Sequence, residues 1–180
     1  MGENTQNKKI AIIIMASGYS ERFGSNKLLE SFLDKPLFTY TVDLVASCQA
    51  EMKIIATRYE SVIQYVKKNV PSMSIVWNAH PERGISESIH LGIRYLKQQK
   101  DYEEYAGCCF MVCDQPLLQK ESMQELFKSF YTNPKGIHMC VTKKVKKIVR
   151  RCTVIPPSSL LNRNNMPISN ARKTTPMPSI

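Results

Sequence analysis

The segment from Met15 to Lys27 has the residue types that bind phosphate. It directly follows a run of apolar residues, contains Gly18 and carries two cations, Arg22 and Lys27. A glycine-containing loop at the end of a strand offers backbone N–H groups and positive charge to an anion, which is what a triphosphate requires. The segment matches neither G-x-x-x-x-G-K-[ST] nor G-x-G-x-x-G, so the P-loop and dinucleotide fingerprints are excluded. On its own it is also compatible with a surface loop whose cations are solvated.

A second candidate is Asp114, which ends the apolar run 107–112 and is followed by Gln115 and Pro116. A carboxylate at the carboxyl end of a central strand is well placed to hold Mg²⁺ on phosphates that enter from the first loop. The alternative for the same residue is a cap on the next turn.

The third candidate is the segment 78–88, which combines Asn78 with two hydroxyls, Ser86 and Ser88. Gly84 supplies backbone freedom just before them, near the start of a predicted helix. Taken alone, this segment predicts only a capped helix.

Strands and helices are predicted in alternation over the first 142 residues. Continuous β-branched runs indicate strands buried on both faces, and apolar residues at i, i+3, i+4 and i+7 indicate helices. Repeated β-α units predict a Rossmann-like α/β fold, with a mostly parallel sheet and helices on both faces. Ligands bind such sheets at the carboxyl ends of the strands, where the three candidates would meet. The predicted strands are 9–15, 52–57, 74–78, 107–112 and 137–142, and the predicted helices are 36–48, 61–69, a segment containing Ile89, Ile93 and Leu96, and 120–131.

Length and charge exclude several classes of protein. A chain of 180 residues with 43% hydrophobic residues predicts one globular domain. No run approaches the ~18 apolar residues of a membrane helix, and the first residues lack the pattern of a signal peptide. The net charge of +10 lies in the tail, because residues 1–142 hold 16 Lys and Arg against 15 Asp and Glu, whereas 143–180 hold 9 against none. We therefore expect no membrane association, and we do not expect the domain to bind nucleic acid.

The six cysteines do not indicate disulfides or a zinc site. Cys108, Cys109 and Cys113 fall within one apolar run, and their spacing does not match paired C-x-x-C hooks. Buried free thiols are expected, in a reducing, cytoplasmic compartment.

Together the three segments resemble the MobA-like nucleotidyltransferase family, and within it the molybdenum cofactor cytidylyltransferase branch. The resemblance covers the chain from about residue 9 to residue 130. Ser17 stands where the family usually has a second alanine, and Phe23 where it usually has Met. The residues that carry the resemblance are Ala16-Ser17-Gly18-Tyr19-Ser20-Glu21-Arg22-Phe23-Gly24 with Lys27-Leu28-Leu29, Lys35-Pro36-Leu37, Asn78, Gly84-Ile85-Ser86-Glu87-Ser88 and Cys113-Asp114-Gln115-Pro116.

The resemblance implies a fold of the nucleotide-diphospho-sugar transferase type. It also implies transfer of an NMP group, CMP in preference to GMP, from an NTP (CTP or GTP) to a phosphorylated acceptor, with Mg²⁺. The implied acceptor is molybdopterin, and a molybdoenzyme is an implied further partner. Arg22, Lys27 and Asp114 are the implied catalytic residues, with Asp114 as the metal ligand. The implied nucleotide-binding residues are Ala16, Ser17, Gly18, Ser20, Arg22, Gly24, Lys27, Asn78, Ser86 and Ser88.

The chain departs from the family after Thr142, where the family usually continues with a glycine-bearing segment, another strand and a closing helix. Residues 143–180 are basic, hold 5 prolines and have no amphipathic period. We therefore expect an NTP-binding domain over 1–142 whose C-terminal part is incomplete, followed by a disordered tail over 143–180. Two alternatives stay open. One is an inactive nucleotide-binding or partner-binding protein whose tail contacts acidic partners, such as nucleic acid or a molybdoenzyme; the other is a transferase that acts on a sugar phosphate or an isoprenoid phosphate.

Overall fold

The computed structural model describes residues 9–19, 26–144 and 147–156, with the backbone alone between 140 and 152. Short 3-10 turns lie at Pro81–Arg83 and Tyr102–Glu104. The helices are α1 (Leu37–Ser47), α2 (Glu60–Asn69), α3 (Ile85–Lys97) and α4 (Lys120–Thr132). The strands are β1 (Lys9–Ala16), β2 (Ser31–Phe32), β3 (Lys35–Pro36), β4 (Met52–Thr57), β5 (Ser74–Trp77), β6 (Tyr105–Val112), β7 (His138–Lys144) and β8 (Lys147–Ile155).

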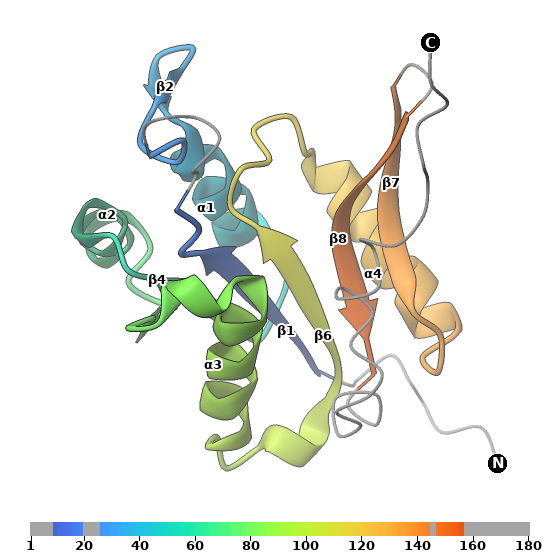
Figure 1. Ribbon diagram of the computed structural model, residues 1–180. Coiled ribbons are helices and arrows are strands. Elements are labelled where there is room, and N and C mark those ends of the chain that lie inside the picture. The colour runs from blue at the N-terminus through green and yellow to red at the C-terminus, as the bar shows by residue number, and fades with distance from the viewer. Residues whose placement is uncertain (1–8, 20–25, 145–146, 157–180) are drawn as a thin grey trace, which may run out of the picture.

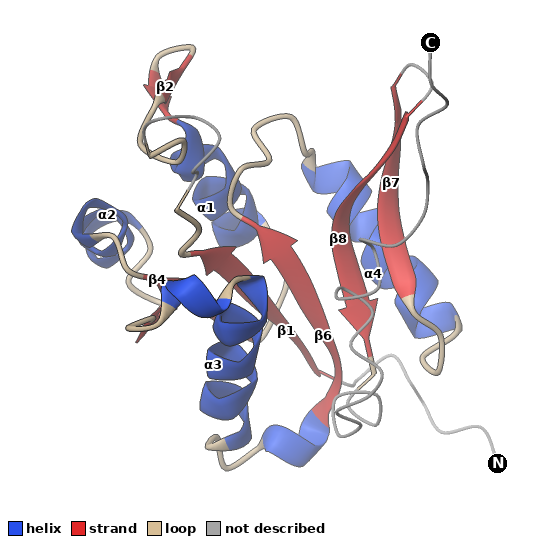
Figure 2. Ribbon diagram, viewed as in Figure 1, coloured by secondary structure: helices blue, strands red, loops and turns tan. Residues whose placement is uncertain are grey.

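One six-stranded sheet organises the described part of the chain, in the order β5-β4-β1-β6-β8-β7 (Figure 1). The first four strands in this order are parallel, whereas β8 runs antiparallel to β6 and β7 antiparallel to β8. Helices cover both faces of the sheet (Figure 2). The predicted α/β fold with a mostly parallel sheet is therefore confirmed.

Strand β1 is the centre of the core because it is buried on both faces. Ile10, Ile12 and Ile14 pack with apolar residues of α1, α2 and α4. Ala11 and Ile13 point to the opposite face and pack with α3. Each fully buried aliphatic side chain contributes ~1.5–3 kcal/mol through burial, so this strand fixes the position of the loop that follows it. None of the helices within the described ranges is long and apolar enough to cross a bilayer.

Strand β8 lies in the stretch that was expected to be a structureless tail, so the predicted boundary after residue 142 falls inside the sheet. Residues 152–155 pair with 108–111 of β6, and β7 continues to Lys144. Val154 and Ile155 are buried. The prediction gave weight to the positive charges and the prolines, although the segment is also rich in β-branched residues, which favour strands. Lysines are moreover common on the edge strands of sheets, and β7 is such a strand. Residues 157–180 lie outside the described part of the chain.

Candidate functional site

The carboxyl ends of β1, β4, β5 and β6 form one edge of the sheet (Figure 1). Hydrogen bonds join the loops that leave this edge. The Cys113 N–H donates to the Met15 carbonyl over 3.1 Å, and the Asn78 N–H donates to the Thr57 carbonyl over 2.9 Å. The Thr57 hydroxyl donates in turn to the Ala16 carbonyl over 3.0 Å. The loops after the four parallel strands are therefore held in one connected arrangement.

Lys27 and Asp114, which lie 87 positions apart in the sequence, meet at this edge. The Lys27 Nζ lies 2.9 Å from Asp114 Oδ2, and the Gln115 side-chain amide donates to Asp114 Oδ1 over 3.2 Å. The Thr41 hydroxyl fixes the backbone on both sides of Asp114. It donates to the Cys113 carbonyl over 3.2 Å and accepts from the Gln115 N–H over 3.3 Å. Both charged side chains are partly exposed, at 39% and 33%, so a ligand can reach them.

The predicted phosphate loop is described at its two ends. At the start of the loop, the Ser17 hydroxyl donates to the Ala56 carbonyl over 3.0 Å, and the Gly18 carbonyl accepts from the Tyr59 hydroxyl over 2.6 Å. Ser17 and the carbonyl of Gly18 thus fasten the loop to the end of β4. Three further predicted residues lie outside the described residues and stay predictions: Ser20, Arg22 and Gly24.

Asn78 and Ser88 are brought together as a buried pair. The Asn78 amide nitrogen donates to the Ser88 hydroxyl over 3.1 Å, and its oxygen accepts from the His80 N–H over 2.9 Å. Ser86 is exposed, and its hydroxyl donates to the Arg83 carbonyl over 3.1 Å. In these contacts Asn78 and Ser88 hold the loop after β5 onto α3, while their predicted role in nucleotide binding stays a prediction.

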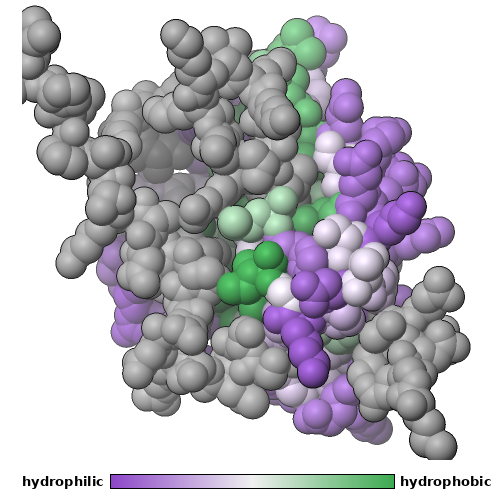
Figure 3. Space-filling model, turned by 90° about the vertical axis from the view of Figure 1, so that its right-hand side faces the viewer, coloured by the Kyte–Doolittle hydropathy of each residue, from purple (hydrophilic) through white to green (hydrophobic). Residues whose placement is uncertain are grey.

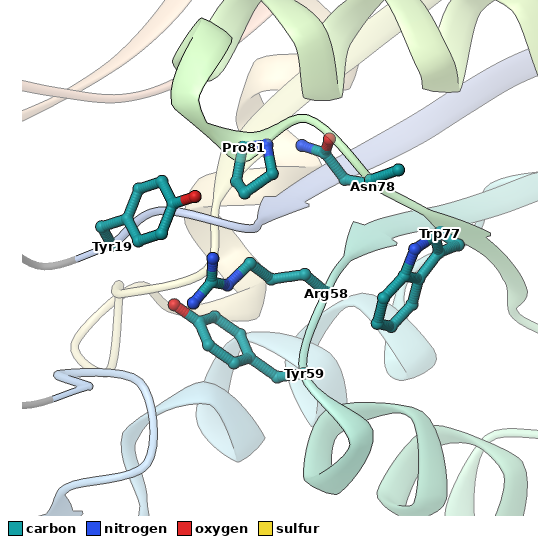
Figure 4. Close-up of a pocket in the computed structure, with 7 residues that line it drawn as sticks. Tyr19, Arg58, Tyr59, Trp77, Asn78 and Pro81 are labelled. Atoms are coloured by element: carbon teal, nitrogen blue, oxygen red, sulfur yellow. The ribbon is translucent and has the colours of Figure 1, made fainter.

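Sequence reasoning missed a cavity on the β4 and β5 side of the same edge. It has a volume of about 320 Å³. The Arg58 guanidinium lies against two aromatic rings there, 4.1 Å from the centre of Tyr19 and 5.1 Å from the centre of Tyr59 (Figure 4). We call this cavity the aromatic pocket; its lining residues are Tyr19, Arg58, Tyr59, Trp77, Asn78, Ala79 and Pro81. A usable signal was present, because Arg58 and Tyr59 directly follow a predicted strand of the same sheet.

Comparison with known proteins decides the family. Residues 12–163 match the family model described as the MobA-like NTP transferase domain. The chain belongs to this family. The predicted family and its general activity, NTP transfer, are thereby confirmed, as is a fold of the nucleotide-diphospho-sugar transferase type.

Solved structures share the fold of this NTP transferase. The crystal structure of Rv0371c from Mycobacterium tuberculosis H37Rv has a TM-score of 0.64 and 14% identity, over 85% of this chain and 74% of that chain. The complex of Rv0371c with manganese gives 0.60 and 14%, over 83% and 72%. A homologue of Rv0371c from Mycobacterium sp. strain JC1 gives 0.60 and 19%, over 83% and 70%. No curated protein matches the chain.

The donor set of this NTP transferase fits a metal held jointly with its substrate. Within the described ranges, no group of three or more His, Cys, Asp or Glu side chains could hold a metal ion by itself. Mg²⁺ is commonly bound through one or two carboxylates together with substrate phosphates and water. Asp114, with its partly exposed carboxylate, suits this mode.

The thiol next to the site is not a nucleophile. Burial raises the pKa of Cys113, and the neighbouring charge of Asp114 raises it further. A thiol in this environment stays protonated at neutral pH and is inert. The reactivity of the site therefore depends on positioning and charge rather than on this side chain.

Proposed function

We propose that this NTP transferase transfers CMP from CTP, in preference to GMP from GTP, to the phosphate of molybdopterin, with Mg²⁺ as cofactor. The base and the acceptor come from the resemblance to the molybdenum cofactor cytidylyltransferase branch. The manganese complex of the structural neighbour Rv0371c supports a divalent metal.

The observation that carries the proposal is the contact between Lys27 and Asp114, 2.9 Å apart at the end of the parallel strands. NMP transfer needs a cation on the triphosphate and a carboxylate that can hold a metal on the same phosphates. We infer that the two side chains neutralise one another until the nucleotide binds. Lys27 then turns to the phosphates, and Asp114 becomes free to bind the metal.

The reaction needs no nucleophilic side chain. A phosphate oxygen of the acceptor attacks the α-phosphorus of the NTP and forms the new P–O bond. The bond between the α-phosphorus and the bridging oxygen breaks, and pyrophosphate leaves with that electron pair. Bound Mg²⁺ would supply positive charge to the phosphates. Lys27 contributes charge from the protein, and the Thr41 contacts hold the Asp114 loop in place.

Buried cysteines that are in no disulfide support a reducing, cytoplasmic compartment. Among the described residues, these are Cys48, Cys108, Cys109 and Cys113. A molybdoenzyme that receives the product is a further proposed partner.

Pyrophosphate release tests the proposal. The purified chain is incubated with CTP or GTP, Mg²⁺ and molybdopterin, with sugar 1-phosphates and isoprenoid phosphates in parallel reactions. We expect release that requires molybdopterin and is faster with CTP. If pyrophosphate were released with a sugar phosphate or an isoprenoid phosphate but not with molybdopterin, that compound would be the acceptor instead. Nucleotide binding without turnover on any acceptor would favour the inactive binding protein.

A further inference from the structure

The aromatic pocket contains one charged side chain, Arg58, which packs against two tyrosine rings. Arg58 is half-buried, and its guanidinium lies against the rings of Tyr19 and Tyr59 (Figure 4). Within the part of the chain that the structure describes, the guanidinium has neither a hydrogen-bond acceptor nor an ion-pair partner. Two other polar groups of the lining are already engaged, since the Tyr59 hydroxyl donates to Gly18 and the Asn78 amide bonds to Ser88. Arg58 is therefore the charged donor that a ligand can meet here.

The two tyrosine rings restrict Arg58, because its guanidinium carbon lies within cation–π distance of both, 4.1 Å and 5.1 Å from their centres. A guanidinium in such contacts carries its N–H donors in its own plane, where acceptors can reach them. Holding the group in advance also lowers the entropy lost when a ligand binds. The guanidinium offers a planar fork of two parallel donors, which matches two neighbouring acceptor atoms on a planar ligand.

The rest of the lining suits a planar ring. Trp77 is 55% exposed at the end of β5. An exposed indole provides a stacking surface for a heteroaromatic ring. The pocket lies on the β4 and β5 side of the sheet edge, and the Tyr59–Gly18 contact joins it to the start of the phosphate loop. The pocket thus lies beside the start of the phosphate loop, and in the proposed complex it would receive the base of a nucleotide whose phosphates lie at Lys27.

We infer that Arg58 is a specificity-determining residue that selects bases with two adjacent acceptors, cytosine or guanine, over uracil and adenine. This inference rests on the proposed function. Guanine presents O6 and N7 to an arginine fork, and cytosine presents O2 and N3. Uracil carries a hydrogen at N3, and adenine places an amino group beside N7, so each offers one acceptor where the fork needs two. A good bidentate contact discriminates between bases by roughly 10- to 100-fold.

Trp77 makes the test direct, because it is the one tryptophan in the chain. Quenching of its fluorescence reports binding at the pocket. The titrations use CTP, UTP, GTP and ATP with Mg²⁺, and tripolyphosphate serves as a probe without a base, by competition. For the unsubstituted chain we expect CTP to bind about 10- to 100-fold more tightly than UTP, and GTP more tightly than ATP by a similar factor.

Two substitutions of Arg58 separate the effect of its planar pair of donors from the effect of its positive charge. Arg58→Gln should bring the affinities for CTP and UTP to within about threefold of each other while tripolyphosphate binds as before. Arg58→Lys keeps the charge but loses the planar fork, so it should lose the same discrimination. Arg94→Gln is the matched control, since Arg94 is exposed near the end of α3 and does not line the pocket. Thermal unfolding verifies that each variant is folded.

The outcomes distinguish this inference from the proposed function. If the unsubstituted chain binds all four nucleotides equally, or if both Arg58 variants keep the preference for CTP over UTP, Arg58 does not read the base. In either case acceptor-dependent turnover of CTP would leave the proposed function intact. If neither nucleotides nor tripolyphosphate bind, both are wrong.

Discussion

Lys27→Ala should separate nucleotide binding from folding, and the contacts of Lys27 give the size of both effects. The ion pair with Asp114 is partly exposed, at 39% and 33% of the two side chains. Exposed pairs of this kind contribute about 0–1 kcal/mol to stability, because solvent screens them. For a chain of this length that corresponds to a decrease in Tm of no more than about 4 °C. A charge-assisted contact to a phosphate contributes ~1.5–3 kcal/mol to binding, so the Kd for Mg-CTP should rise about 10- to 150-fold.

Calorimetric titration with Mg-CTP measures the affinity, and thermal unfolding measures the stability. Lys9→Ala is a suitable control, because Lys9 is also ion-paired, 2.6 Å from Asp101 and 2.8 Å from Glu104, at the opposite end of β1. The control should leave the Kd unchanged. An unaltered Kd in Lys27→Ala would show that Lys27 does not contact the phosphates. A large loss of Tm would show that the pair is structural.

Three further outcomes test the metal site, the sheet and the thiol. Asp114→Asn should keep the fold and abolish the Mg²⁺ dependence of CTP binding, measured as the ratio of Kd with and without Mg²⁺; an unchanged ratio would make Asp114 a turn cap. Val154→Thr should lower the free energy of unfolding, measured by urea denaturation, by ~1–3 kcal/mol, because it buries an additional hydroxyl. Thr153→Val is the control: Thr153 is half-buried, so the change should be less than about 0.5 kcal/mol. Equal effects would contradict the packing of β8. Cys113, whose pKa is raised by burial and by Asp114, should react with a thiol reagent at pH 8 only after denaturation, as mass spectrometry can show; rapid labelling of the folded protein would refute this.

The two central parallel strands, β1 and β6, were predictable because they are buried on both faces. In β1, seven consecutive residues from Ile10 to Ala16 are buried, which produces a continuous apolar run rather than an alternating one. Strand β8 lacks such a run, although it lies between β6 and the edge strand β7. Its pairing depends on contacts with distant strands, which the local charge pattern does not report.

The candidate site was predictable where a charged residue lies in a loop that follows a predicted strand and also holds turn-forming residues. Lys27 and Asp114 meet this condition, and the parallel topology brings them into contact. The aromatic pocket was missed, although Arg58 directly follows β4, because Tyr19 follows β1, Trp77 ends β5, and each of the three is unremarkable alone. Only the strand order β5-β4-β1 makes them neighbours. Side chains that gain a function through adjacency in the sheet cannot be recognised one segment at a time.

The two halves of the site should also respond differently to salt. Lys27 faces charged phosphates in the proposed complex, whereas Arg58 faces a neutral base, so added salt screens the first contact far more than the second. We expect the Kd for CTP to rise between 50 and 300 mM KCl, with Mg²⁺ held constant, by about the same factor in the unsubstituted chain and in Arg58→Gln. The rise should be smaller in Lys27→Ala, because one of the screened contacts is absent. If Arg58→Gln instead flattened the salt dependence as much as Lys27→Ala, Arg58 would be a phosphate contact, and the assignment of the aromatic pocket to the base would be wrong.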